Sequence, residues 1–197
     1  DLNHEPVMFA ALHVNGKAPL ARVVEGPVPK WKIAGKRGHG LFGKSSTGLF
    51  GTTYGLPRFS TAIFDARFPF TAIEVHEEIN PVSCRVMGWS PFIPGKADDS
   101  GLPAAAVEYT FRNTSLDEVE AVFSFHAQNF MQQAESGARV ERTERGFILR
   151  QDDPECPPER GCACGSASPE GAFSIVTNAE KPAIDAAWFR GGWFDSV

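Results

Sequence analysis

Cysteine is scarce in this sequence, with 4 residues among 197. A disulfide scaffold needs a denser pattern, so we expect a buried apolar core to hold the fold together. A chain of this length can form such a core without cross-links. The hydrophobic fraction of 42%, with 16 phenylalanines, indicates a folded globular chain rather than a disordered one.

Long apolar runs and long blocks of like charge are also absent. No stretch approaches the roughly 18 apolar residues that a membrane-spanning helix requires, so we expect no transmembrane segment. The net charge of −5 gives no attraction toward nucleic acid, which we exclude as a partner. The sequence begins with polar, acidic residues and without Met, unlike a secretory signal. We expect a piece of a longer protein, and its localisation stays open.

The 19 glycines and 15 prolines are scattered along the chain and disfavour helices of ordinary length. Apolar residues mostly alternate with polar ones. Val107, Tyr109 and Phe111 share one face of a predicted strand. The alternation resumes over residues 119–126, after a turn-like stretch at residues 113–118. We therefore predict an antiparallel pair of strands joined by a short loop.

The remaining pattern favours many short strands, and only residues 131–145 could hold a short helix. This is typical of an all-β fold, and we predict one domain over residues 1–197, a large two-sheet antiparallel β-sandwich with long loops. Whether that sandwich is complete stays open. The other predicted strands cover residues 7–14, 20–25, 60–66, 71–77, 82–88, 146–150, 172–177 and 186–189.

Two stretches read as long loops, a glycine-rich one at residues 35–55 and a second at residues 152–171. The second contains Cys156, Cys162 and Cys164, which could bind zinc if a fourth ligand came from elsewhere. The usual CxxC spacing is missing, so a disulfide from Cys156 to either other cysteine, or free thiols, remain alternatives. We expect no cofactor.

Candidate catalytic carboxylates are Glu74, Glu77 and Glu78, but acidic residues at strand ends are usually only solvated. In a loop constrained by proline, Asp98, Asp99 and Ser100 can hydrogen-bond the local backbone, which favours a loop-shaping role over ligand contact.

A histidine lies late in a strong strand pattern, at position 126, close before Asn129. His126 could face a pocket, although a structural histidine is the simpler interpretation. No GxSxG sequence is present to indicate a serine nucleophile.

Several segments together resemble the N-terminal domain of glycoside hydrolase family 116, which includes non-lysosomal glucosylceramidases and bacterial β-glucosidases. The most specific stretch is SPFIPGKADDSGLPAAAVEYTFRN at residues 90–113. The preceding ARFPFTAIEV at residues 66–75 and the closing AWFRGGWFD at residues 187–195 are also similar to that family.

The resemblance implies a β-sandwich packed against a catalytic (α/α)6 barrel that lies beyond residue 197. It implies a retaining hydrolase whose nucleophile and acid/base are both on the barrel, so no catalytic residue is assigned to this chain. The partners would be that barrel and, through it, a β-glucoside or a glucosylceramide-like substrate. Candidates for the rim of the sugar site or for the interface are Arg58, Asp98, Asp99, Ser100, His126 and Asn129.

Packing against a barrel should leave an apolar patch on this domain when it stands alone. Phe68, Phe70, Trp89 and Phe92 are the residues we expect to contribute to it. The alternative function is a stand-alone carbohydrate-binding or adhesion module of the same fold class.

Overall fold

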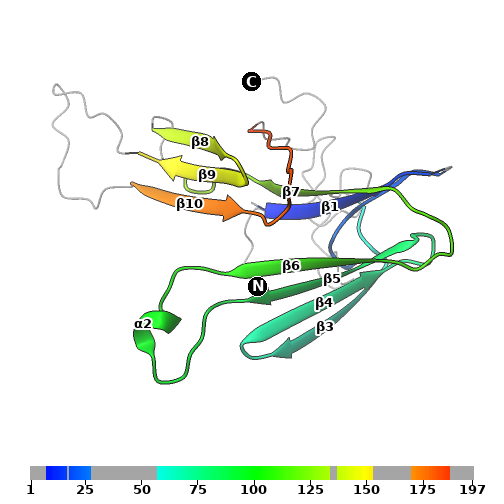
Figure 1. The fold of residues 1–197 in the computed structure, drawn as a ribbon, viewed down its shortest axis with the longest axis horizontal. Helices are drawn as coiled ribbons and strands as arrows, with labels where there is room; N and C mark the ends of the chain where they lie inside the picture. The colour runs from blue at the N-terminus through cyan, green and yellow to red at the C-terminus, as the bar shows by residue number, and fades with distance from the viewer. Residues whose placement is uncertain (1–7, 17, 28–56, 134–136, 153–169, 187–197) are drawn as a thin grey trace, which may run out of the picture. The chain divides into compact units, whose positions relative to one another are not determined.

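The computed structural model describes residues 8–16, 18–27, 57–133, 137–152 and 170–186. Within these residues the chain is all-β, with antiparallel strands and one short helix, α2 (Ala97–Ser100) (Figure 1). No helix among them is long and apolar enough to cross a membrane. The strands are β1 (Met8–Val14), β2 (Leu20–Val23), β3 (Thr61–Arg67), β4 (Phe70–His76), β5 (Val82–Trp89), β6 (Ala106–Asn113), β7 (Ala121–Ala127), β8 (Ala138–Thr143), β9 (Gly146–Gln151) and β10 (Gly171–Val176).

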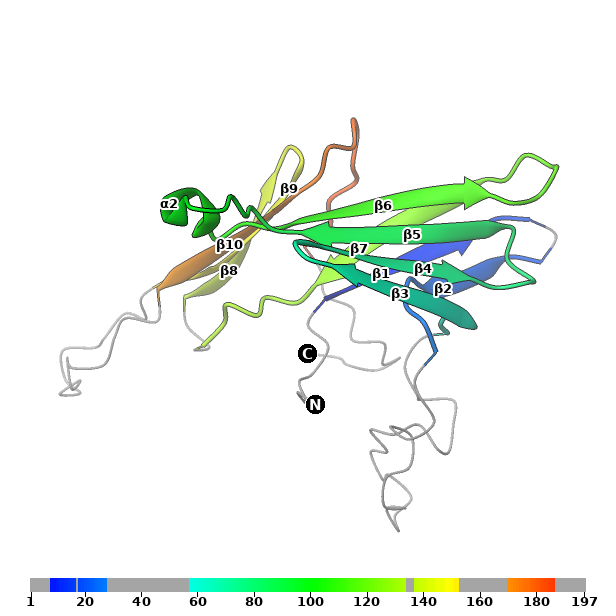
Figure 2. The ribbon, with the colours of Figure 1, turned by 90° about the horizontal axis from the view of Figure 1, so that it is seen from below.

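These strands form three sheets in the described chain, with orders β2-β1-β7, β3-β4-β5-β6 and β10-β9-β8. The prediction of an all-β fold is confirmed, whereas the two large sheets that we expected are three smaller ones. The four strands β3–β6 lie side by side in both views, and the loop that carries α2 extends from the ends of β5 and β6 (Figure 2).

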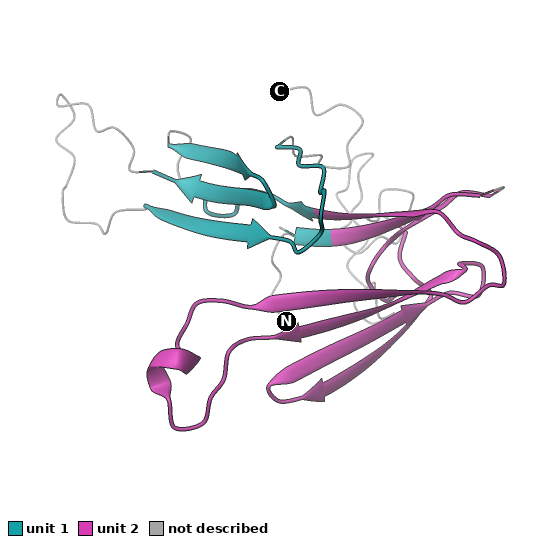
Figure 3. Cartoon of the chain, viewed as in Figure 1, with its two compact units in different colours: residues 1–9, 126–197 teal, residues 10–125 magenta. Residues whose placement is uncertain are grey.

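The chain divides into two compact units (Figure 3). Unit 1 comprises residues 1–9 and 126–197 and contains the sheet β10-β9-β8. Unit 2 comprises residues 10–125 and contains the sheet β3-β4-β5-β6 with most of β1, β2 and β7.

The core of unit 2 gathers buried side chains from both of its sheets. Leu12 on β1 contributes from one sheet, Val75 and Cys84 from the other, and Phe59 from the segment before β3. Burying a leucine or phenylalanine stabilises a fold by about 1.5–3 kcal/mol relative to leaving it exposed. In unit 1, Leu149 on β9 is the counterpart, with almost no exposed surface.

The predicted pairing of residues 107–112 with residues 119–126 is wrong. Strand β6 pairs with β5, and β7 belongs to the sheet with β1. The two strands instead face each other through their rings, with Phe123 at 4.7 Å from Tyr109 and 5.1 Å from Phe111. An alternating strand can bury its apolar face across a core as well as beside a neighbour, so the pattern alone does not decide between them.

Three further predictions are wrong or concern residues that the structure does not describe. Residues 138–143 form β8 rather than part of a helix, after a glycine at 137 with φ of 84°. The loop at residues 93–102 contains a helical turn, α2, where we expected none. Ala186 is not in a strand, and residues 187–189, the loop at residues 35–55 and the cysteine loop lie outside the described residues.

Candidate functional site

Four aromatic side chains gather at one end of the four-stranded sheet, and we call them the aromatic patch: Phe68, Phe70, Trp89 and Phe92. Their exposed fractions are 79%, 48%, 40% and 46%, high for residues of this size. Phe70 pairs directly with Trp89 across β4 and β5, and the ring of Phe68 meets that of Phe92 edge to face at 4.7 Å. The expected exposure of these four residues is confirmed.

Two members of the patch, Phe70 and Trp89, owe their exposure to the period of the strands. Val75 and Cys84 are a direct pair that points into the core. Phe70 lies five residues before Val75, and Trp89 five residues after Cys84, so both rings point away from the core. An odd spacing along a strand changes the face, which turns an apolar residue outward here.

The rest of this outward face is mixed, with charged pairs beside the exposed Ile63. Arg85 pairs with Glu74 across the two strands at 3.5 Å, and Arg67 pairs with Asp65 at 3.2 Å. Charged groups that pair in this way are typical of a surface in contact with water. The aromatic patch is therefore a local feature of one end of the sheet and not a property of the whole face.

The loop next to the patch is held in shape by one hydroxyl group. Ser100 Oγ accepts a hydrogen bond from Ile93 N at 3.0 Å and lies 2.8 Å from the carbonyl oxygen of Lys96. The backbone also closes here, because Ser100 N donates to the same carbonyl at 3.1 Å. A turn tied at two points holds its shape better than a loop without such bonds.

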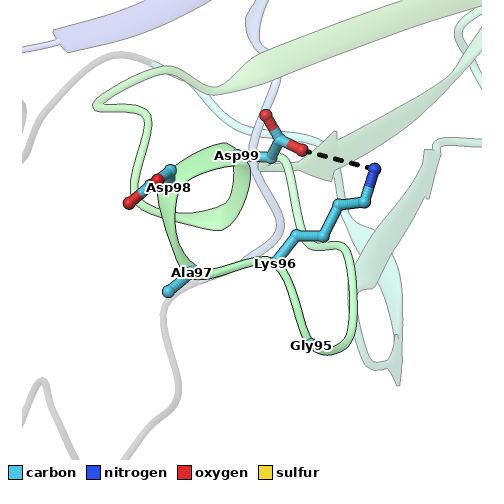
Figure 4. Close-up of a pocket in the computed structure, with 5 residues that line it drawn as sticks. All are labelled: Gly95, Lys96, Ala97, Asp98 and Asp99. Carbon is cyan, nitrogen blue, oxygen red and sulfur yellow. Dashed lines mark ion pairs between the residues drawn. The ribbon is translucent and has the colours of Figure 1, made fainter.

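Asp98 and Asp99 project from this turn, beside a shallow open depression that they line with residues 95–97 (Figure 4). Lys96 Nζ lies 3.9 Å from a carboxylate oxygen of Asp99. Both aspartates are exposed. The depression is too open to enclose a ligand, and the two carboxylates are in contact with solvent.

The other three rim candidates are each engaged with local groups. Arg58 donates to Glu25 at 2.9 Å within unit 2. In unit 1, His126 stacks on Phe9 with ring centroids 4.4 Å apart, and burial lowers the pKa of its imidazole. Asn129 donates to the carbonyl oxygen of Arg150 at 3.0 Å, so its amide ties the segment after β7 to β9.

The glutamates considered as catalytic groups also have structural roles or exposed positions. Arg22 makes two contacts with Glu77, at 2.7 and 3.2 Å, in a pair that is largely buried. Glu74 pairs with Arg85, and Glu78 is exposed. Two of these three glutamates are therefore bound to an arginine in the folded chain.

Sequence reasoning missed Gln151, which is fully buried at the end of β9. Its Oε1 accepts from Gln133 N at 3.0 Å, and its Nε2 donates to the carbonyl oxygen of Asp152 at 2.8 Å. A lone glutamine after an apolar strand carries no signal of such a role. Among the described residues, no three His, Cys, Asp or Glu side chains lie together as metal ligands, and the cysteine loop falls outside them.

A family model described as β-glucosidase 2, glycosyl-hydrolase family 116, N-terminal, matches residues 7–191. The chain is an N-terminal domain of glycoside hydrolase family 116. A search of curated proteins found no match to it. Membership of family 116 implies a catalytic domain in the same protein. The aromatic patch and the turn at residues 93–102 both lie on unit 2 of this family 116 domain.

Proposed function

We propose that this family 116 domain is the non-catalytic β-sandwich of a glucosylceramidase-like retaining β-glucosidase. It braces a catalytic (α/α)6 barrel of the same protein and helps to shape the rim of the sugar site. The observation that carries the proposal is the family match over residues 7–191.

The carboxylates of the described chain support a non-catalytic role. Retaining hydrolysis needs one carboxylate as nucleophile and one carboxylic acid as proton donor, about 5–5.5 Å apart. The carboxylates of Glu25, Glu74, Glu77 and Asp152 are each paired with an arginine. Each of these four carboxylates is thus engaged in a local ion pair, which supports a structural role for them.

The rim role belongs to the exposed carboxylates of the turn at residues 93–102. Carboxylates can accept hydrogen bonds from sugar hydroxyls, and Ser100 keeps the backbone of the turn in place. Arg58, His126 and Asn129 remain candidates for the interface through the backbone segments that they hold.

The test of the reaction compares hydrolysis of an aryl β-glucoside by the longer gene product and by the 197-residue chain. We expect turnover only in the longer product. Turnover by the 197-residue chain would place the catalytic carboxylates here, and no turnover by either would remove the β-glucosidase assignment.

The rim role is tested in the longer product with the double substitution Asp98→Asn and Asp99→Asn. Each substitution replaces one acceptor oxygen at the rim with a donor NH2 and removes the charge, and together they should raise KM about tenfold, or about 1.4 kcal/mol, with little change in kcat. The matched control is Asp65→Asn, which changes an exposed carboxylate on β3. Equal KM values for both variants would exclude the turn from the rim and leave the bracing role standing.

A further inference from the structure

The aromatic patch points to a specific contact: we propose that it is the surface by which this domain docks onto the catalytic domain of its own protein. The inference rests on the proposed function only in that it takes the following domain as the partner. The patch lies wholly within unit 2, on β4, β5 and the connections that follow β3 and β5.

The composition of the patch favours a protein partner over a sugar. A sugar site joins an aromatic face to several hydrogen-bonding groups, but three of the four patch residues are phenylalanines and Trp89 adds a single indole N–H donor. The nearest charged pair in the register, Arg67 with Asp65, satisfies its own charges. Exposed aromatic rings with so few polar groups of their own match the centre of a protein interface, where water is excluded.

The size of the patch favours a partner that is covalently attached. Four aromatic side chains of about 150–250 Å² each, near half exposure, offer roughly 400 Å². A stable complex between separate chains buries about 800 Å² on each side, so this patch falls short of what a free partner or a second copy needs. A domain on the same chain is present at a millimolar effective concentration, at which a smaller contact suffices.

The flanking charges define the partner surface further. Asp98 and Asp99 are exposed on the turn at residues 93–102, which directly follows Phe92. A partner with an apolar centre and basic groups on the side that meets this turn would complement both features.

The experiment places the photo-crosslinker p-benzoylphenylalanine at position 92 in the full-length protein. The ring of Phe92 is exposed, so the larger side chain fits without disturbing the core. The control has the crosslinker at Ile63, which is exposed and lies on the same outward face beside Glu74. We expect position 92 to capture a peptide from beyond residue 197 and Ile63 to capture none.

Capture of a peptide within residues 1–197, capture of a second copy, or no capture at position 92 would overturn the proposal. Activity on the aryl β-glucoside, measured on the same protein, separates this inference from the proposed function. A crosslink to the following domain in a protein without that activity would keep the docking surface and reject the reaction. An active protein without the crosslink would reject the surface alone.

Discussion

Single polar side chains hold several connections of this domain in shape. Asn113 is an example, because its Oδ1 accepts from Ser115 N at 2.9 Å and its Nδ2 donates to the carbonyl oxygen of Asp117 at 2.7 Å. Ser100 and Asn129 act in the same manner elsewhere. These residue types also occur in binding sites, so their chemistry alone does not separate a loop tie from a ligand contact.

The thiol of Cys84 is expected to be inert. Burial raises its pKa to about 12, so almost none of the thiolate that reacts with alkylating agents forms at pH 8. Treatment of the folded protein with iodoacetamide at pH 8 should leave Cys84 unmodified, and the same treatment in denaturant should modify it fully. Peptide mass spectrometry reads both states, and rapid modification in the folded protein would contradict the burial of this strand.

At the scale of elements, the sequence predicts most strand positions but not their partners. The alternation over β4, β5 and β6 locates these strands to within about one residue of the observed bounds. Pairing depends on which faces meet across the core, and this information is not local. For that reason the sequence pattern predicts that β6 pairs with β7, whereas in the structure the two strands lie in different sheets.

Strand β8 shows a different limit. Its sequence, ARVERT, is rich in charged residues that favour a helix, and it is a strand because it pairs along its length with β9. An ion pair joins the two strands, with Glu141 of β8 bound to Arg150 of β9 at 3.0 Å, and Glu141 is also paired with Arg139 within β8. Long-range pairing overrides local propensity here.

The β8–β9 hairpin should lose stability in acid. Arg139 lies 2.5 Å from a carboxylate oxygen of Asp152, and this hydrogen bond lowers the pKa of the Asp152 carboxyl. A carboxyl whose pKa is lower in the folded state than in the unfolded state stabilises the fold at pH values above its unfolded pKa of about 3.9. This stabilisation is lost as the pH falls below about 3.9 toward the folded pKa.

We therefore expect Asp152→Asn to lower the melting temperature at pH 7 and to have a smaller effect at pH 3. The matched control is Asp117→Asn, at an exposed aspartate in the turn after β6. Equal effects of Asp152→Asn at both pH values would exclude the ion pair as the cause.

At the scale of the whole molecule, the two units have separate apolar centres. Phe59 is fully buried among β1, β4 and β5 residues of unit 2, and Leu149 is buried in unit 1. Large-to-small substitutions at such sites cost about 2–5 kcal/mol, because they remove buried surface and leave a cavity.

We expect Phe59→Ala to speed amide hydrogen exchange mainly in β4 and β5, and Leu149→Ala to speed it mainly in β8 and β9. Exchange measured by mass spectrometry on both variants gives the comparison. A uniform increase over all strands in either variant would show that the two units open as one.

The exposed aromatic patch is easier to predict from the sequence than the residues at the rim of the sugar site. The four members of the aromatic patch were expected because a domain that packs on a barrel should expose apolar side chains, and all four are exposed. The rim candidates depend on loop shape, which here is set by contacts such as that of Ser100 with Ile93. The buried Gln151 gave no local signal, because its role comes from a segment that folds back onto it.

The sheet β2-β1-β7 joins strands that are more than a hundred residues apart in the chain, with Asn15 N donating to Glu120 O at 2.9 Å next to the strands. Ribosomes add roughly 5–20 residues per second, so β1 leaves the ribosome several seconds before β7 exists. During this time one edge of β1 has no neighbour from its own chain. We expect that this edge can then accept a strand from a neighbouring nascent chain, which is the first step of a domain swap.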